Sequence, residues 1–184
     1  LAISEKVLGP EDPDSATVQN NLALVYAAVG AYAKAEALFK HALTVHLTIL
    51  GREDPRSAST MTNLGDLYRR MGAPGEAEPL LADALAILEK IQGPEHPETA
   101  KALNNLAVLY DSMGAYAKAE PLYMRALATS ENANGPWHPQ TASSLSNLAV
   151  LYVSTGAYAK AKPLYVRALG IHEVALGPLH PRIA

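Results

Sequence analysis

Residues 92–133 read QGPEHPETAKALNNLAVLYDSMGAYAKAEPLYMRALATSENA, and this stretch decides the fold because its pattern recurs with a step of 42 residues. The glycine of its Gly-Pro pair, Gly93, has counterparts at Gly9, Gly51, Gly135 and Gly177. A second glycine series and a tyrosine series keep the same step, at Gly30, Gly72, Gly114 and Gly156 and at Tyr26, Tyr68, Tyr110 and Tyr152. Self-similarity at such a period indicates a repeat array.

The register predicts a single array over residues 1–184. Four full repeats are expected at 8–49, 50–91, 92–133 and 134–175. We expect residues 1–7 to be the end of a preceding repeat and residues 176–184 to be the start of a fifth. One repeat cannot bury its apolar face alone, so stability must come from stacking on its neighbours.

Each repeat is expected to form two helices. The first begins at the proline of pairs such as Asp54-Pro55 and His96-Pro97, because proline suits the first helical position and an aspartate before it can cap the helix. It ends at the second glycine series, since glycine adopts the left-handed conformation that closes a helix. The second helix runs to just before the next Gly-Pro pair, and its apolar residues are spaced by three and four. The sequence therefore predicts an all-α fold of antiparallel helix pairs.

The composition argues against several kinds of function. The 184 residues include 15 Lys and Arg against 18 Asp and Glu, and the formal charge of −3 gives no general reason to bind nucleic acid or an anionic membrane. Without cysteine there is no disulfide, thiolate metal site or cysteine nucleophile. The longest apolar run, residues 22–33, is too short for a bilayer span, which needs about 20 residues. We expect no nucleic-acid partner, no membrane partner and a cytoplasmic location.

These features resemble the tetratricopeptide repeat. The small and large signature positions of that family correspond to Leu106, Ala107, Tyr110, Ala119, Tyr123 and Ala126. The 42-residue length, with LGPEDP at 8–13 and NNLA at 104–107, is similar to the kinesin light chain type. Residues 50–91 depart most, because Arg52 replaces the loop proline and Gly65 replaces alanine. The resemblance implies a right-handed superhelical solenoid whose first helices line a concave groove.

An asparagine column on the first helices is the leading candidate for a binding site. It consists of Asn21, Asn63, Asn105 and Asn147, with Asn20 and Asn104 beside it. An asparagine amide has both donors and an acceptor, so it can hold a peptide bond by two hydrogen bonds. The resemblance implies the same use, because tetratricopeptide and kinesin light chain domains use asparagines on this face for peptide ligands. The alternative is that each asparagine bonds the neighbouring helix and ties the repeats together.

Basic and apolar side chains are predicted on the same face. Arg69, Arg70 and Lys101 could hold a ligand carboxylate, which arginine binds in a bidentate manner. Local ion pairing, for example with Asp66, is the alternative, and it contributes little on a wet surface. The apolar candidates are Leu24, Val108 and Val150. They either receive ligand side chains or are scattered surface residues, which are common.

The remaining residues offer no catalytic or metal chemistry. His96, His138 and His180 are one repeat apart, too far for one zinc ion because packed helices lie about 8–10 Å apart and zinc–nitrogen bonds are about 2.1 Å. They are expected to be cap or loop residues. No phosphate-binding loop or serine elbow motif occurs. Trp137, the only tryptophan, lies in a loop and is expected to pack on its neighbouring helix. We expect no enzyme activity, metal or cofactor.

Two functions fit these patterns. The first is a protein–protein interaction scaffold that binds an extended peptide in the concave groove. The alternative is a structural or regulatory arm of a larger signalling protein, which acts through oligomerisation or intramolecular contacts. In that case the exposed apolar ends of the array would support self-association, because terminal repeats leave such faces uncovered.

Overall fold

The computed structural model describes residue 9 and residues 11–176, and every regular element in this part of the chain is a helix. The chain divides into two compact units, one up to Ile91 and one from Gln92. The N-terminal unit contains α2 (Pro13–Ala28), α3 (Tyr32–Val45), the π-helical η1 (His46–Leu50), α4 (Pro55–Arg70) and α5 (Pro74–Ile91). The C-terminal unit contains α6 (Pro97–Ser112), α7 (Tyr116–Asn134), α8 (Pro139–Ser154) and α9 (Tyr158–Leu176).

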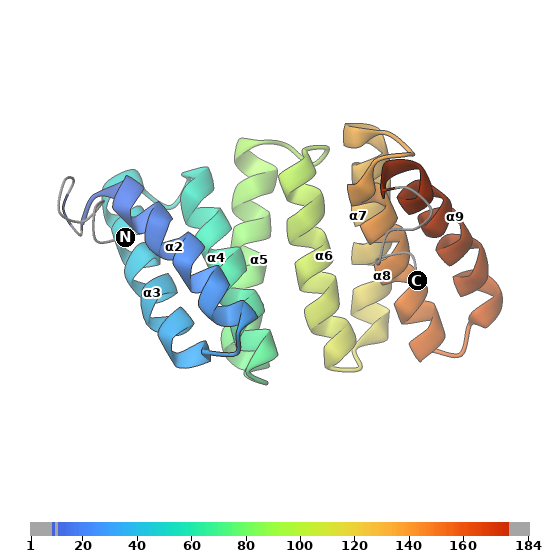
Figure 1. The fold of residues 1–184 in the computed structure, drawn as a ribbon, viewed down its shortest axis with the longest axis horizontal. Coiled ribbons are helices and arrows are strands. Elements are labelled where there is room, and N and C mark those ends of the chain that lie inside the picture. The colour runs from blue at the N-terminus through green and yellow to red at the C-terminus, as the bar shows by residue number, and fades with distance from the viewer. Residues whose placement is uncertain (1–8, 10, 177–184) are drawn as a thin grey trace. The chain divides into compact units, whose positions relative to one another are not determined.

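The helices form hairpins in which each first helix packs on the second helix that follows it (Figure 1). Within the N-terminal unit α3 also contacts α4, and within the C-terminal unit α7 also contacts α8. The prediction of an all-α fold built from helix pairs is confirmed.

The first helices begin at proline as the sequence predicts, and a side chain caps each one. The Asp12 carboxylate accepts a hydrogen bond from the Asp14 amide at 2.8 Å. His96 and His138 do the same with a ring nitrogen, since each Nδ1 accepts from the backbone amide two residues on, at 3.2 and 3.1 Å. The capping role expected of these two histidines is confirmed, and His180 lies outside the described residues. Such caps satisfy amides that have no partner inside the helix.

The turn after α4 shows why the second glycine series ends the first helices. Gly72 has φ +73°, a backbone conformation that residues with a Cβ rarely adopt. Its amide donates to the Arg69 carbonyl at 3.1 Å, and the Ala73 amide donates to the Tyr68 carbonyl at 2.9 Å. These bonds satisfy carbonyls at the end of α4 and reverse the chain into α5.

Alanines and large side chains from both helices of the repeat pack together in the core. In the C-terminal unit Ala107, Ala119, Tyr123, Leu148 and Leu151 form one buried cluster. The helical spacing predicts a buried stripe on α6 of Leu103, Leu106, Ala107 and Tyr110; the first three are at most 6% exposed, whereas Tyr110 is half-buried. The close approach of the helices therefore depends on alanine, as the repeat pattern indicates.

The sequence did not predict the π-helical turn that ends the second helix of the first repeat. Its first residue, His46, is buried. His46 Nδ1 lies 3.0 Å from the Thr60 hydroxyl of α4, and its Nε2 lies 3.2 Å from the Pro13 carbonyl of α2. Burial lowers the pKa of this imidazole. The equivalent residues in the other repeats are Leu88, Ser130 and His172. The Ser130 hydroxyl lies 3.1 Å from the hydroxyl of Ser144, the counterpart of Thr60, so a polar contact recurs at this junction in the third repeat. Among the described residues, the π-helical turn itself is found only in the first repeat.

Candidate peptide-binding surfaces

The asparagines of the N-terminal unit connect α2 to α4. Asn63 donates through Nδ2 to Asn20 Oδ1 at 3.0 Å, and Asn20 donates to Asn21 Oδ1 at 3.3 Å. Asn20 is only 8% exposed, whereas Asn63 is half-buried and Asn21 is exposed. The expectation that Asn20 lies on an open face is therefore wrong, because α4 covers it. Asn63 keeps a second N–H and acceptor capacity beyond its bond to Asn20.

The same link recurs between α6 and α8 of the C-terminal unit. Asn147 Nδ2 lies 3.5 Å from Asn104 Oδ1, and Asn104 donates to the Ser144 hydroxyl at 2.9 Å. Asn104 is 6% exposed, so its predicted place on the open face is also wrong. Asn105 and Asn147 are half-buried. Asn63 and Asn147 thus tie neighbouring repeats together, as the alternative interpretation of the asparagine column predicts.

A polar hollow adjoins Asn147. Asn147, Ser143 and Ser146 of α8 line it together with His172 of α9, and its volume is about 300 Å³. Both serine hydroxyls donate to carbonyls of α8, at 3.1 and 2.9 Å, so their oxygens can still accept hydrogen bonds. Nδ1 of His172 is buried and has no hydrogen-bond partner among the described residues. The hollow can therefore accommodate a polar group such as a peptide bond.

The predicted basic residues are paired with acids nearby on their own helices. Asp66 accepts from Arg69 at 2.7 Å and from Arg70 at 2.7 Å, so this cluster on α4 has one positive charge left over. On α6, in the other unit, Lys101 lies 2.5 Å from Glu98. The alternative of local ion pairing therefore accounts for all three, and Arg70 is the more exposed arginine.

The predicted apolar contact residues differ in exposure. Leu24 is 44% exposed and Val150 is 45% exposed, whereas Val108 is half-buried against the cluster around Tyr123. Asp111 lies one turn beyond Val108 on α6, and its pKa is raised by burial, although a hydrogen bond from the Tyr123 hydroxyl lowers it in part. Trp137 is 65% exposed, so its expected packing on the neighbouring helix is wrong.

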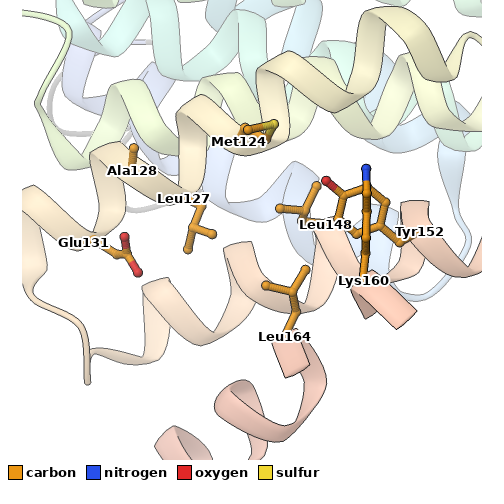
Figure 2. A pocket seen from close by; sticks show the side chains of 8 residues that line it. All are labelled: Met124, Leu127, Ala128, Glu131, Leu148, Tyr152, Lys160 and Leu164. Carbon is orange, nitrogen blue, oxygen red and sulfur yellow. The ribbon is translucent and has the colours of Figure 1, made fainter. Parts of the chain in front are cut away.

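An apolar hollow between α7, α8 and α9 went unnoticed in the sequence. Its volume is about 350 Å³, and Figure 2 shows the side chains that face it from the three helices. The lining includes Met124 and Leu127 of α7, Leu148 and Tyr152 of α8, and Lys160 and Leu164 of α9. Leucine and tyrosine at these positions are ordinary core residues of the repeat, so the periodic pattern contained no signal for a hollow.

The described part of the chain has neither a cluster of potential metal ligands nor a helix that could span a membrane. Residue 9 and residues 11–176 contain no group of three or more histidine or acidic side chains placed to hold a metal ion. None of the helices in these residues combines the length and apolar character needed to cross a membrane.

Comparison with known proteins identifies the repeat. The family model described as tetratricopeptide repeat matches residues 1–48, 14–90, 56–132 and 112–173. The solved structure of BtubC (BKLC) from P. vanneervenii is 28% identical, with a TM-score of 0.78 over 92% of this chain and 68% of that one. Two structures of a kinesin light chain-like protein from Podosopora anserina with nearly identical TPR-like repeats, one of them a point variant, are each 27% identical. Their TM-scores are 0.75 and 0.72 over 95% of this chain and 82% and 83% of theirs. A search of curated proteins found no match.

Proposed function

Because the chain belongs to the tetratricopeptide repeat family, whose repeats generally mediate protein–protein interactions, we propose that it is a cytoplasmic scaffold that binds an extended peptide along its first helices. The observation that supports this most directly is the polar hollow beside Asn147. The Asn147 side chain, the side chains of Ser143 and Ser146, and the His172 side chain line it together. An extended peptide has unpaired backbone amides and carbonyls, and these groups match that lining. Asn21, Asn63 and Asn105 would supply further amide contacts on the other first helices.

Acidic and apolar side chains of the peptide would have defined places. Asp66 neutralises one of its two arginine partners, so the exposed Arg70 can turn to a ligand carboxylate. Lys101 would first have to leave Glu98. Leu24, Val108 and Val150 would contact apolar side chains of the peptide, and Val108 would contribute least because it is half-buried. We expect modest affinity, because ordering a flexible peptide costs free energy.

The test is a selection of random displayed peptides on the chain, followed by measurement of Kd for the enriched peptides by fluorescence polarisation. The comparison protein has Asn63→Ala, Asn105→Ala and Arg70→Glu together. We expect it to bind at least about tenfold more weakly, because two amide contacts are lost and one charge is reversed.

Tyr68→Phe is the matched control. It removes the hydrogen bond from the Tyr68 hydroxyl to Glu36 at 3.0 Å, which is directed toward α3 rather than along the asparagine column. The free energy of unfolding should fall by an amount similar to that for the loss of the Asn63–Asn20 bond, while peptide affinity stays unchanged. If the enriched peptides bind the triple variant as tightly as the parent, peptide contact through these residues is refuted.

A second candidate function, self-association, is favoured by apolar side chains at the first and last described helices. Val25 of α2 is 58% exposed, Val29 directly after α2 is 73% exposed, and Val166 of α9 is 63% exposed. Uncovered repeat faces of this kind can pair between chains. Light scattering during size-exclusion chromatography should show a mass that rises with concentration and returns to the monomer in Val29→Lys/Val166→Lys. A monomer at every concentration would exclude this candidate.

A further inference from the structure

We propose that the apolar hollow between α7, α8 and α9 is a second docking site, which takes one bulky apolar side chain from an acidic segment of a partner protein. The site is separate from the asparagine column and does not depend on it. Its lining includes Leu148 of α8, which is almost fully buried, and the half-buried Leu127 and Leu164. A hollow of about 350 Å³ with such a lining is large enough for one large side chain and favours an apolar one.

Met124 is an exposed apolar residue in the lining of this hollow. Its side chain is 54% exposed at the rim (Figure 2). Methionine is flexible and polarisable, so it can adapt to the shape of an incoming side chain. A half-exposed methionine beside the buried Leu148 and the half-buried Leu127 and Leu164 provides apolar surface that a ligand can cover.

The N-terminal unit has a lysine at the position of Met124. Lys40 stands two repeat steps before Met124, and its Nζ lies 5.9 Å from the centre of the Tyr68 ring and 2.6 Å from Glu36. Tyr68, the counterpart of Tyr152, is only 9% exposed. The position of Lys160 is occupied by Glu76. The cation beside this ring comes from Lys40 in the N-terminal unit and from Lys160 in the C-terminal unit, so the repeat fold accepts either lysine or methionine at the position of Met124.

The charges on the second helices indicate an acidic occupant. In the C-terminal unit α7 and α9 carry five cationic residues against three glutamates, which leaves two positive charges on a chain of formal charge −3. The cations are Lys118, Arg125, Lys160, Lys162 and Arg167. The second helices of the N-terminal unit have the opposite balance, with three lysines against five acids. Complementary charge therefore favours an acidic segment on the second helices of the C-terminal unit over those of the N-terminal unit.

Lys160 is the residue that would contact the acidic partner at the mouth of the hollow. Its Nζ lies 4.8 Å from the centre of the Tyr152 ring and 3.7 Å from Glu120, which also accepts a hydrogen bond from Tyr152 at 2.9 Å. The Lys160 side chain is 64% exposed, so it can swing to a ligand carboxylate at little cost. Glu131 at the other end of the lining is held 2.5 Å from Arg167, which offsets its repulsion of an acidic ligand.

The experiment is a selection of random displayed 15-residue peptides on the chain, with removal of those that also bind Met124→Lys. Lysine at this position has a precedent in Lys40, so the variant should fold, and its melting temperature and helicity are checked first. We expect the surviving peptides to share one bulky apolar residue and a net negative charge. Their affinity should fall at least about tenfold on Met124→Lys, and it should also fall on Lys160→Glu and at high salt.

Methyl NMR locates the bound peptide independently of any loss of affinity. Among the four methionines, the Met124 methyl signal should shift during titration of a surviving peptide, whereas that of the buried Met61 should not. The variant with Asn63→Ala, Asn105→Ala and Arg70→Glu should bind these peptides normally, which separates this site from the proposed first-helix site. The proposal is overturned if no peptide depends on Met124, if those that do are neutral or basic, or if the Met124 methyl does not respond.

Discussion

Gly65 allows a direct measurement of how tightly a first helix packs on a second. The equivalent residues in the other repeats are all alanine, at Ala23, Ala107 and Ala149. A Cβ added at Gly65 would lie 2.7 Å from Cγ and 2.8 Å from Cδ2 of Leu81, and Leu81 is only 1% exposed. Carbon atoms in favourable contact are about 3.5–4.0 Å apart. Gly65→Ala therefore requires the Leu81 side chain or helix α5 to move.

Two opposing effects set the size of the change in stability. Alanine is favoured over glycine inside a helix by about 1 kcal/mol. Overpacking a closed core typically costs about 1–3 kcal/mol. The two terms leave a loss of roughly 0–2 kcal/mol, and because Leu81 is enclosed we expect about 1 kcal/mol. For a chain of this size that lowers Tm by about 2–4 °C.

The first repeat supplies the compensating change. There Ala23 faces Phe39, and both are fully buried. The double variant Gly65→Ala/Leu81→Phe recreates that pair, so the two substitutions should couple favourably by about 1 kcal/mol or more. Urea unfolding followed by circular dichroism measures all four proteins of the cycle, and hydrogen exchange in α4 and α5 checks that the effect is local. If Gly65→Ala alone stabilises the chain by about 1 kcal/mol, Leu81 yields freely and the reasoning is refuted.

Three further predictions concern packing and pH. Ala119→Leu should overpack the cluster around Tyr123 and cost about 1–3 kcal/mol, so an unchanged Tm would contradict the placement of Ala119 at 0% exposure. The pKa of Asp111 is higher in the folded chain than its ordinary value of 3.8. As the pH rises above 3.8, the carboxyl ionises first in the unfolded chain, so the free energy of unfolding falls. Asp111→Asn should therefore raise Tm at neutral pH, and this gain should disappear in acid. The pKa of His46 is lower in the folded chain than its ordinary value of 6.5. As the pH drops below 6.5, this histidine is protonated first in the unfolded chain, so the free energy of unfolding falls. His46→Leu should flatten the Tm profile between about pH 7 and 5, and an equally steep profile would show that other groups cause it.

The helix boundaries could be predicted because they depend on local chemistry. Proline fixes its own φ and lacks an amide, so Pro55 and Pro97 mark helix starts without reference to the rest of the chain. Gly72 marks an end for an equally local reason. The 42-residue step then transfers each local inference to every repeat. The π-helical turn at His46 was missed because it accompanies contacts with Pro13 and Thr60 on two other helices.

The candidate binding face was predicted less well, because helical period alone does not say what covers a residue. Asn20 and Asn104 lie on the side of the first helix that seemed open, yet the next first helix buries both. Arg70 and Lys101 were predicted as ligand contacts with local ion pairing as the alternative, and both are paired, with Asp66 and Glu98 within one turn of them. Each difference arises from a neighbour that the periodic pattern places only approximately.

The two proposed sites differ in what a repeat sequence can reveal about them. The asparagine column is present in every repeat, and in both units it bonds one first helix to the next, so stacking alone is sufficient reason for its regularity. Met124 has no such explanation, because the same position holds Lys40, Ala82 and Val166 in the other repeats. A position that varies while the fold stays the same is not required by the fold. Comparison of repeats within one chain therefore identifies Met124 as a better candidate for a dedicated contact than the column that first attracts attention, and the Met124→Lys selection tests that ranking.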